Sequence, residues 1–525
     1  MTSFHWLLFF LLLQVIHFLG TWKLYEAAGR KSWEAAVPVY NAIVLMKIIN
    51  RPTWWTLLLF IPIVNLIMFP VVWVETIRSF GKNTALDTFL VLITFGLYIY
   101  YINYTQKPEY IKDRSLSPKN KTADTISSLL FAIVVATIVH GYAIQPFNIP
   151  SSSLEKSLLI GDFLFVSKIN YGARPPMTAI AAPMVHDTLP LLNKKSYLSW
   201  PQLPYFRLPG FQKIKNNDIV VFNWPRDTLF NMYLPADKRY DKPVDKKTNY
   251  VKRCVGIPGD SLSIKDGIVF INGKELILPE RAKPQYSYKV AYDGKTPIDF
   301  PALLKSMDIT DPAGFLDDSK RDTIYFKSLT FAAAEQLRHI PGITGVDRII
   351  TPGPEDGIFP DFKDGKPSVS NHWSCDNYGP IYIPEAGKTV ALTTKTLPFY
   401  KLIITEYEGN TLREDGNDIY INDKKATTYT FKQNYYWMMG DNRHNSLDAR
   451  YFGYTPEDHI VGKPVFIWMS LDPNEKGLKK IRWDRVFTTV GGDGQPQSYF
   501  KYFLIVLALY FGLDYFIKKR KQKQA

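Results

Sequence analysis

The sequence predicts a multi-pass membrane protein with an extracytoplasmic domain dominated by β-strands. Three observations lead to this fold class. Apolar stretches long enough to cross about 30 Å of hydrocarbon recur along the chain. Clusters of lysine and arginine, which favour the cytoplasmic side, flank the apolar stretches near the middle and at the end of the chain. Between those clusters, short β-branched and aromatic runs alternate with turn residues, as is typical of a β domain.

Five apolar stretches are long enough to be predicted as membrane spans. The initial one lacks a basic start and a small-residue cleavage site, so we interpret it as an anchor rather than a cleaved leader. The stretch 37–49 is interrupted by Pro38, Asn41 and Lys47, which favours an interfacial or re-entrant segment over a full span. The predicted spans are Phe4–Leu19, Trp54–Val74, Leu86–Tyr104, Ile126–Ile144 and Tyr499–Phe516.

The basic clusters predict the orientation. One cluster precedes the fourth span and the other follows the last span, so both can be cytoplasmic only if Gln145–Ser498 lies on the far side. The loop with Lys23 and Arg30 then also falls inside, and the N-terminus outside. A solvated basic tail is the alternative interpretation of the terminal cluster. The clusters are Lys107, Lys112, Arg114, Lys119 and Lys121, and then Lys518, Lys519, Arg520, Lys521 and Lys523.

Length, charge and cysteine content limit the classes of function that fit this chain. The 525 residues exceed one compact domain of about 150 residues, and the formal charge is +14. Nucleic-acid binding would be one explanation of this charge, but no such motif is present, and the basic membrane flanks already account for it. Cys254 and Cys375 fit no zinc spacing and no disulfide framework. We favour two free thiols, and a single bridge remains the alternative.

The region between the basic clusters has the pattern of a β domain. Two hairpins are expected, one turning at Asn272-Gly273 and the other within "NDIYINDKKAT". The segment from Leu276 to Leu397 is less regular and predicts an insertion or subdomain, with one helix-like patch at Ser328–Ile340. The expected strands are Asp218–Trp224, Gly267–Gly273, Lys401–Gly409 and Asp418–Asp423.

Three serines in "IPSSSLEKSLLIGD" follow the fourth predicted span directly. A serine nucleophile needs a base, and none of the eight histidines stands in a pattern typical of a Ser–His–Asp triad. A lysine can act instead if burial keeps it neutral. Lys252 lies in the apolar run "NYVKRCVGIPGD", whereas Lys156 stands between Glu155 and Ser157 and is expected to stay solvated and protonated.

A third stretch, "MMGDNRHNSLDARYFG", concentrates polar residues directly after an aromatic run. Asp448 and Arg450 are spaced to pair, and Ser446 can offer a hydrogen bond. A turn rich in local side-chain to backbone bonds is the alternative interpretation.

Together these boxes, in this order after an apolar helix, resemble those of bacterial type I signal peptidases. The likeness spans about Ala143–Trp468 without the insertion. It implies Ser153 as nucleophile, Lys252 as general base, and an oxyanion site made by Ser151 and the backbone of Ser153. It also implies supporting roles for Ser446, Asp441, Asp448 and Arg450. The sequence departs from the commonest pattern at Leu154, Lys156, Ser157, His444 and Ala449.

The resemblance implies a catalytic domain of the signal peptidase type on the extracytoplasmic, periplasmic side of the inner (plasma) membrane. Its substrates would be preprotein signal peptides, cut after small residues at −1 and −3. The lipid bilayer and the secretion translocon are candidate partners, and neither cofactor nor metal is expected. The predicted organisation is a membrane region 1–122, a span 123–145, a catalytic domain in two parts, 146–275 and 398–490, around the insertion 276–397, a last span 499–517 and a basic tail 518–525.

Two rival hypotheses remain. Ser153-Leu154-Glu155-Lys156 matches the S-x-x-K pattern of penicillin-binding enzymes, although no K-T-G element accompanies it and only "CDN" at Cys375–Asn377 approaches S-D-N. A non-catalytic membrane scaffold that retained the fold is the second rival.

Overall fold

The computed structural model describes residues 2–117, 121–232, 238–317, 319–360, 372–492 and 494–524. Lys119 of the first basic cluster, and the side chains of Lys521 and Lys523, lie outside the described residues. The chain forms two compact units. The first comprises 1–143, 174–208 and 238–247, and the second comprises 144–173, 209–237 and 248–525.

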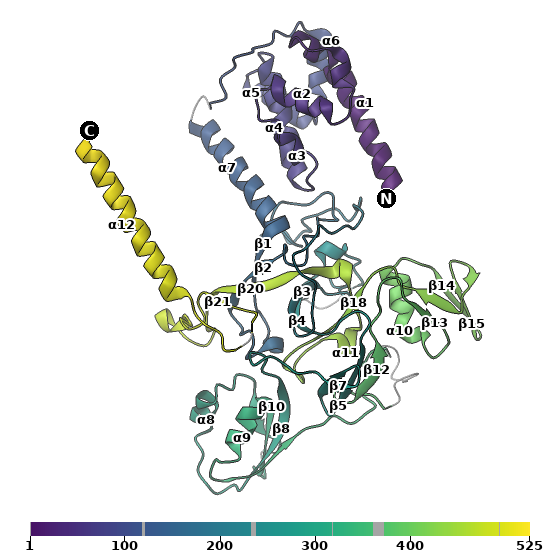
Figure 1. The fold of residues 1–525 in the computed structure, drawn as a ribbon, viewed down its shortest axis with the longest axis vertical. Coiled ribbons are helices and arrows are strands. Elements are labelled where there is room, and N and C mark those ends of the chain that lie inside the picture. The colour runs from purple at the N-terminus through teal and green to yellow at the C-terminus, as the bar shows by residue number, and fades with distance from the viewer. Residues whose placement is uncertain are drawn as a thin grey trace. The chain divides into compact units, whose positions relative to one another are not determined.

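Three helices of the described chain are long and apolar enough to cross a membrane: Ser3–Ala27, Lys121–Ala143 and Phe500–Arg520. They correspond to the first, fourth and fifth predicted spans. The first is helix α1, the second joins α7 (Lys121–Ile138) to a π-helical turn, and the third lies within α12 (Phe500–Gln524) (Figure 1).

The predicted single span Trp54–Val74 is wrong. The segment forms α3 (Trp55–Leu58) and α4 (Val64–Ser79), separated by a break. Pro62 lies in this break, where its ring removes a backbone donor and constrains the residue before it, and Ile63 has a φ of 69°.

The third predicted span, Leu86–Tyr104, is bent by 115° between α5 (Ala85–Ile93) and α6 (Tyr98–Thr105). Gly96, with a φ of 86°, supplies the left-handed backbone at this bend. The pair is therefore either a broken span or a re-entrant loop. The stretch 37–49 contains α2 (Tyr40–Ile48), whose nine residues are too few to span a bilayer.

The second unit is built on one twisted sheet of eight strands. Their order is β1-β2-β20-β3-β4-β18-β19, with β21 pairing with β20, and these neighbouring strands are antiparallel. Buried aromatic and aliphatic residues such as Phe222, Tyr435 and Trp437 form its core. The strands are β1 (Ile144–Asn148), β2 (Asp162–Ser167), β3 (Ile219–Asn223), β4 (Asn249–Gly256), β18 (Tyr435–Met439), β19 (Thr455–Pro456), β20 (Ile460–Ser470) and β21 (Thr488–Thr489).

Smaller sheets flank the main one, and both predicted hairpins are confirmed. Asn272 and Gly273 turn between β6 and β7, and Asn422 and Asp423 turn between β15 and β16, all with positive φ. The strands are β5 (Ser261–Lys265), β6 (Ile268–Ile271), β7 (Lys274–Glu275), β12 (Tyr378–Tyr382), β13 (Thr389–Ala391), β14 (Leu412–Asp415), β15 (Asp418–Ile421), β16 (Lys424–Lys425) and β17 (Thr428–Thr430).

The predicted strand Lys401–Gly409 is wrong, because this segment is helical. It comprises the end of α10 (Leu397–Leu402) and a π-helical turn, Ile403–Tyr407. Pro398 occupies the first turn of α10, a position that proline favours. Leu397, Tyr400 and Ile404 are all buried, and their spacing is that of one helix face.

The segment 276–397 contains a sheet and a core of its own. Strands β8 (Gln285–Tyr292), β9 (Ala313–Phe315), β10 (Thr323–Thr330) and β11 (Ile343–Arg348) pair in the order β11-β8-β10-β9. Residues such as Tyr288, Val290 and Phe326 form a separate apolar cluster beneath α8 (Phe300–Ser306) and α9 (Phe331–Leu337). The helix-like patch at 328–340 is thus confirmed as α9, while the surrounding region is more regular than its sequence indicates.

Candidate active site

Ser153 lies in a short 3₁₀ turn, Ser152–Leu154, between β1 and β2. Leu154 and Leu158, which flank the serine, are buried in an apolar cluster with Val166 and Val221 of the main sheet. These apolar anchors fix the turn against the sheet, and the side chain of Ser153 is itself almost fully buried.

Lys252 reaches Ser153 from the middle of β4, opposite Val220 of β3. Its Nζ lies 2.7 Å from Ser153 Oγ. Lys252 is only 5% exposed. Among the described residues no histidine hydrogen-bonds Ser153, so Lys252 is the basic side chain within hydrogen-bond distance of its hydroxyl.

Burial sets the protonation of Lys252. Desolvation lowers its pKa to about 8, although the carboxylates of Asp448 and Asp441 favour its charged form. A lysine is ordinarily protonated at this pH. The burial that the apolar run predicts therefore produces an amine with a substantial neutral fraction near pH 8.

Asp441 holds the segment that follows Ser153. Its Oδ1 and Oδ2 accept from Arg253 Nε and Nη2 at 2.8 and 2.6 Å, and Oδ2 also accepts from Ser157 Oγ at 2.5 Å. Burial opposes ionisation of Asp441, but the Arg253 guanidinium and these hydrogen bonds keep its pKa below the usual value. Sequence analysis missed Arg253 and Ser157 as site residues, although both lie inside the quoted boxes.

Asp448 and Arg450 form the second buried pair. Arg450 Nε and Nη2 donate to the two carboxylate oxygens at 2.9 and 2.7 Å, and the Gly440 amide donates to Asp448 Oδ2 at 3.0 Å. Desolvation disfavours the Asp448 carboxylate, yet Arg450 and these hydrogen bonds lower its pKa. The pairing expected from the spacing is present, and it keeps a negative charge near Lys252.

Ser446 lies close to the nucleophile segment, but no hydrogen bond joins it to Lys252 in the described structure. Its hydroxyl is buried without a hydrogen-bond partner. A Cβ added to Gly440 would lie 2.2 Å from Ser446 Oγ and 2.6 Å from the Ser153 carbonyl oxygen. Only glycine therefore fits between these two residues.

Ser151 stands at the start of the 3₁₀ turn with extended backbone, and its side chain is exposed. No hydrogen bond of its hydroxyl is present in the described structure. The hydroxyl is thus near Ser153 in sequence but is not fixed toward it.

Asn442, Asn445 and Asp311 make contacts around the nucleophile that sequence analysis missed. Asn442 donates its backbone N–H to the Ser153 carbonyl at 3.1 Å, and Asn445 Nδ2 donates to Ser152 Oγ at 2.9 Å. Asp311 Oδ2 accepts from the side-chain amides of both asparagines, at 2.7 and 3.2 Å. Asp311 lies outside the helices and strands and outside the motifs quoted above, so no sequence pattern predicted this role.

Lys156 is also held by the insertion. Its Nζ forms an ion pair with Asp308 at 2.5 Å, and its side chain is 17% exposed. Lys156 is thus less solvated than expected, although its partner Asp308 is itself exposed. Neighbouring Glu155 is buried and accepts from Thr310 Oγ1 at 3.1 Å.

Both cysteines are free and buried, which confirms the interpretation of two separate thiols. Cys375, Asp376 and His444 bring their ligand atoms within 4.8 Å of one another. Asp376 is already occupied, because it accepts from His444 Nε2 at 2.9 Å and from the Thr351 amide at 2.8 Å.

Comparison with known proteins decides the family. The model of the family described as "Signal peptidase, peptidase S26" matches residues 122–323 and 386–469, more than half of the chain. The chain belongs to the signal peptidase S26 family. Residues 33–113 match a second model, described only as "Family of unknown function (DUF5684)". The gap in the S26 match, 324–385, falls inside the predicted insertion.

Relatives within the S26 family extend the similarity beyond the active-site boxes. The chain is 24% identical over 383 residues to the signal peptidase I of Buchnera aphidicola subsp. Baizongia pistaciae, covering 72% of this chain and 87% of the relative. It is 23% identical over 390 residues to that of Haemophilus influenzae, with 71% and 78% covered. It is 22% identical over 377 residues to that of Helicobacter pylori, with 70% and 92% covered. This S26 family member is therefore a serine peptidase.

Proposed function

We propose that this peptidase removes N-terminal signal peptides from exported preproteins by a Ser153 nucleophile and a Lys252 general base. The observation that carries the proposal is the 2.7 Å contact between Ser153 Oγ and Lys252 Nζ in a buried setting. Burial lowers the pKa of Lys252 to about 8, so the base is available at mildly alkaline pH.

In the first half-reaction, neutral Lys252 takes the hydroxyl proton while Ser153 Oγ attacks the scissile carbonyl carbon. The tetrahedral intermediate collapses to an acyl-enzyme as its C–N bond breaks, and protonated Lys252 gives the proton to the leaving amine. In the second half, neutral Lys252 takes a proton from water while the water oxygen attacks the ester carbonyl carbon. The C–O bond to Ser153 then breaks, protonated Lys252 returns its proton to Ser153 Oγ, and the carboxylic acid is released.

The oxyanion of each intermediate needs donors. We assign the backbone N–H of Ser153 and the hydroxyl of Ser151, which is exposed and free to turn toward a bound substrate. One such donor is worth about 3 kcal/mol of transition-state stabilisation. Ser446, whose buried hydroxyl has no partner in the described structure, is assigned to orient Lys252 once substrate is bound.

The expected substrate has small residues at −1 and −3, the pattern of signal-peptide cleavage sites. A preprotein with −1 Ala replaced by Trp should not be cleaved, because the bulky side chain would exclude it from a shallow pocket. Equal cleavage of both preproteins would contradict this assignment.

The deciding experiment compares wild type with Ser153→Ala on one preprotein of the A-x-A type in detergent. Wild type should release the mature protein at the predicted bond, and Ser153→Ala should not. Cleavage by neither would favour the scaffold hypothesis. The S-x-x-K alternative is disfavoured by geometry, because Lys156 Nζ pairs with Asp308, whereas Lys252 Nζ lies 2.7 Å from Ser153 Oγ.

A further inference from the structure

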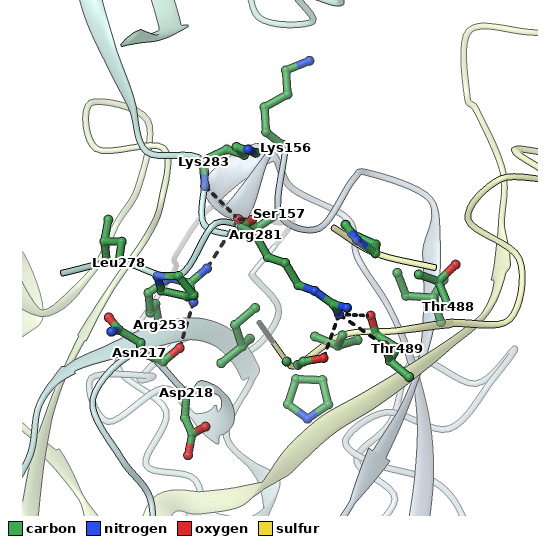
Figure 2. A pocket seen from close by; sticks show the side chains of 18 of the residues that line it. Lys156, Ser157, Asn217, Asp218, Arg253, Leu278, Arg281, Lys283, Thr488 and Thr489 are labelled. Atoms are coloured by element: carbon green, nitrogen blue, oxygen red, sulfur yellow. Dashed lines mark hydrogen bonds between the residues drawn. The ribbon is translucent and has the colours of Figure 1, made fainter. Parts of the chain in front are cut away.

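Seven lysine and arginine side chains line one cavity of about 710 Å³ in the second unit. Figure 2 shows Arg253, Arg281 and Lys283 around this cavity, together with Asp218 and Thr489. The cationic lining residues are Lys156, Lys215, Arg253, Arg281, Lys283, Lys463 and Arg485. The acidic lining residues among those described are Asp218 and Asp484.

Four of these cations are neutralised by carboxylates. The ion pairs are Lys156–Asp308, Arg253–Asp441, Lys463–Asp218 and Arg485–Asp162.

The other three, Arg281, Lys215 and Lys283, form no ion pair within the described part of the chain. The Arg281 guanidinium donates instead to the carbonyls of Thr489 and Gly491, at 2.9 and 2.7 Å, so its charge is not compensated. Of the described acids in the lining, Asp484 alone remains for these three cations. The cavity therefore carries an excess of positive charge.

The cavity is separate from the catalytic dyad. Successive side chains of a strand point to opposite faces of its sheet. Lys252 meets Ser153 on one face of β4, whereas its neighbour Arg253 lines the cavity from the other face. A peptide that presents its scissile bond to Ser153 would approach the first face. The cationic cavity is thus better placed for a ligand other than the substrate.

The same cavity adjoins the start of the C-terminal apolar helix. Thr488 and Thr489 of β21 line it, and the preceding Phe487 packs its ring against Phe500 and Phe503 of α12, with centroids 5.8 and 4.7 Å apart. Pro496, also in the lining, stands four positions before Phe500, a reach of about 14 Å at most. Because α12 is long and apolar enough to cross a membrane, the cavity would lie near the lipid headgroups.

We propose that this cavity binds the phosphate of an anionic phospholipid headgroup. Lysine and arginine are the side chains that bind phosphate oxygens most strongly, and basic pockets beside membrane helices suit lipid headgroups. The volume exceeds the needs of a free phosphate ion. Ile277, Leu278 and Val490 add apolar lining suited to the glycerol and first methylenes of a lipid. This ligand site is independent of the cleavage chemistry proposed above.

The test uses the purified full chain in a neutral detergent, titrated with short-chain phosphatidylglycerol, short-chain phosphatidylcholine or inorganic phosphate in a calorimeter. The test variant is Lys215→Gln with Lys283→Gln, and the matched control is Lys274→Gln with Lys424→Gln, two exposed lysines on hairpins. Phosphatidylglycerol should bind saturably to wild type and control, and at least tenfold more weakly to the test variant. Thermal melting checks folding, and Lys283→Gln alone serves if the double variant is unfolded.

Several results would overturn the proposal. Equal affinity for the two lipids, or unchanged affinity in the test variant, would show that the lysines do not select a headgroup charge. Inorganic phosphate binding as tightly as phosphatidylglycerol would assign the cavity to a free ion. An acidic decapeptide that binds more tightly than the lipid, and loses affinity in the test variant, would assign it to a polypeptide.

Discussion

At the scale of single residues, burial of Lys252 lowers its pKa more than the neighbouring carboxylates raise it. Asp441 and Asp448 both favour protonated Lys252, yet desolvation lowers its pKa to about 8. The two carboxylates are themselves engaged by Arg253 and Arg450. Because each aspartate is already paired with an arginine, it attracts the lysine proton less than a lone carboxylate would.

The first prediction concerns which lysine is the base. Lys252→Ala should reduce preprotein turnover to background, as Ser153→Ala does, and the double variant should be little worse because the pair acts as a unit. Lys252→Arg should be equally inactive, since arginine keeps its proton. Lys156→Ala should change kcat/KM by tenfold or less, about 1.4 kcal/mol. Loss of activity in Lys156→Ala with retention in Lys252→Ala would reverse the assignment.

The second prediction is the pH dependence. Only neutral Lys252 can accept a proton, so kcat/KM should rise about tenfold per pH unit below pH 8 and level off above it. The measurement is a cleavage profile from pH 6 to pH 10. Lys156→Ala should give the same midpoint. A midpoint near 6.5 would point to a histidine and contradict the lysine mechanism.

The third prediction tests the close approach at Gly440. Gly440→Ala would drive a methyl group into Ser446 Oγ and the Ser153 carbonyl, so we expect a loss of about 1–3 kcal/mol of folding stability and a lower kcat. Gly314→Ala is the control, because a Cβ there meets nothing within 4 Å. Thermal melting and cleavage rates provide the two readouts. Wild-type behaviour of Gly440→Ala would mean that the contact relaxes freely.

At the scale of elements, the segment 276–397 contributes contacts to the nucleophile segment. The turn that contains Asp308, Thr310 and Asp311 reaches the nucleophile segment through Lys156 and Glu155. It also reaches the asparagines that hold Ser152 and Ser153. This subdomain, with its own sheet and core, therefore helps to position the serine.

The fourth prediction follows from these contacts. Asp311→Leu would leave the side-chain amides of Asn442 and Asn445 without this acceptor, so kcat should fall by about tenfold, near 1.4 kcal/mol, with a smaller change in KM. Asp311→Asn keeps a carbonyl acceptor and should retain most of the activity. Asp356→Leu, an exposed position in the same insertion, is the control. Equal losses in Asp311→Asn and Asp311→Leu would exclude a hydrogen-bonding role.

Sequence patterns predicted the strands, turns and helices that are determined by residues close together in the chain. Short β-branched and aromatic runs bounded by turn residues identified the hairpins, and apolar composition identified three long helices. Lys401–Gly409 was misassigned because its β-branched residues suit a strand, while burial along one helix face decided the outcome. The family resemblance implied that Ser153 and Lys252 lie together. The contacts of Asp311 with Asn442 and Asn445 depend on long-range packing, which no local sequence pattern predicts.

At the scale of the whole molecule, membrane topology is the open proposal, and it supplies the fifth prediction. The basic clusters place Gln145–Ser498 outside the plasma membrane and the C-terminal tail inside. Protease added to intact spheroplasts should therefore degrade the central domain and spare an epitope attached after Ala525. Protection of the central domain until the cells are lysed would reverse this orientation.

The residues that hydrogen-bond the segment around Ser153 lie far along the chain, so they are synthesised long after it. Ser157 bonds to Asp441, 284 positions later, and Ser152 to Asn442, 290 positions later. The ribosome must therefore make more than four-fifths of the chain before the nucleophile acquires its supports. Until then, Ser152, Ser153 and Ser157 of a nascent chain lack the hydrogen bonds of Asp441 and Asn442. If Ser153 and Lys252 act as proposed, we expect no cutting of the protein's own spans before that point.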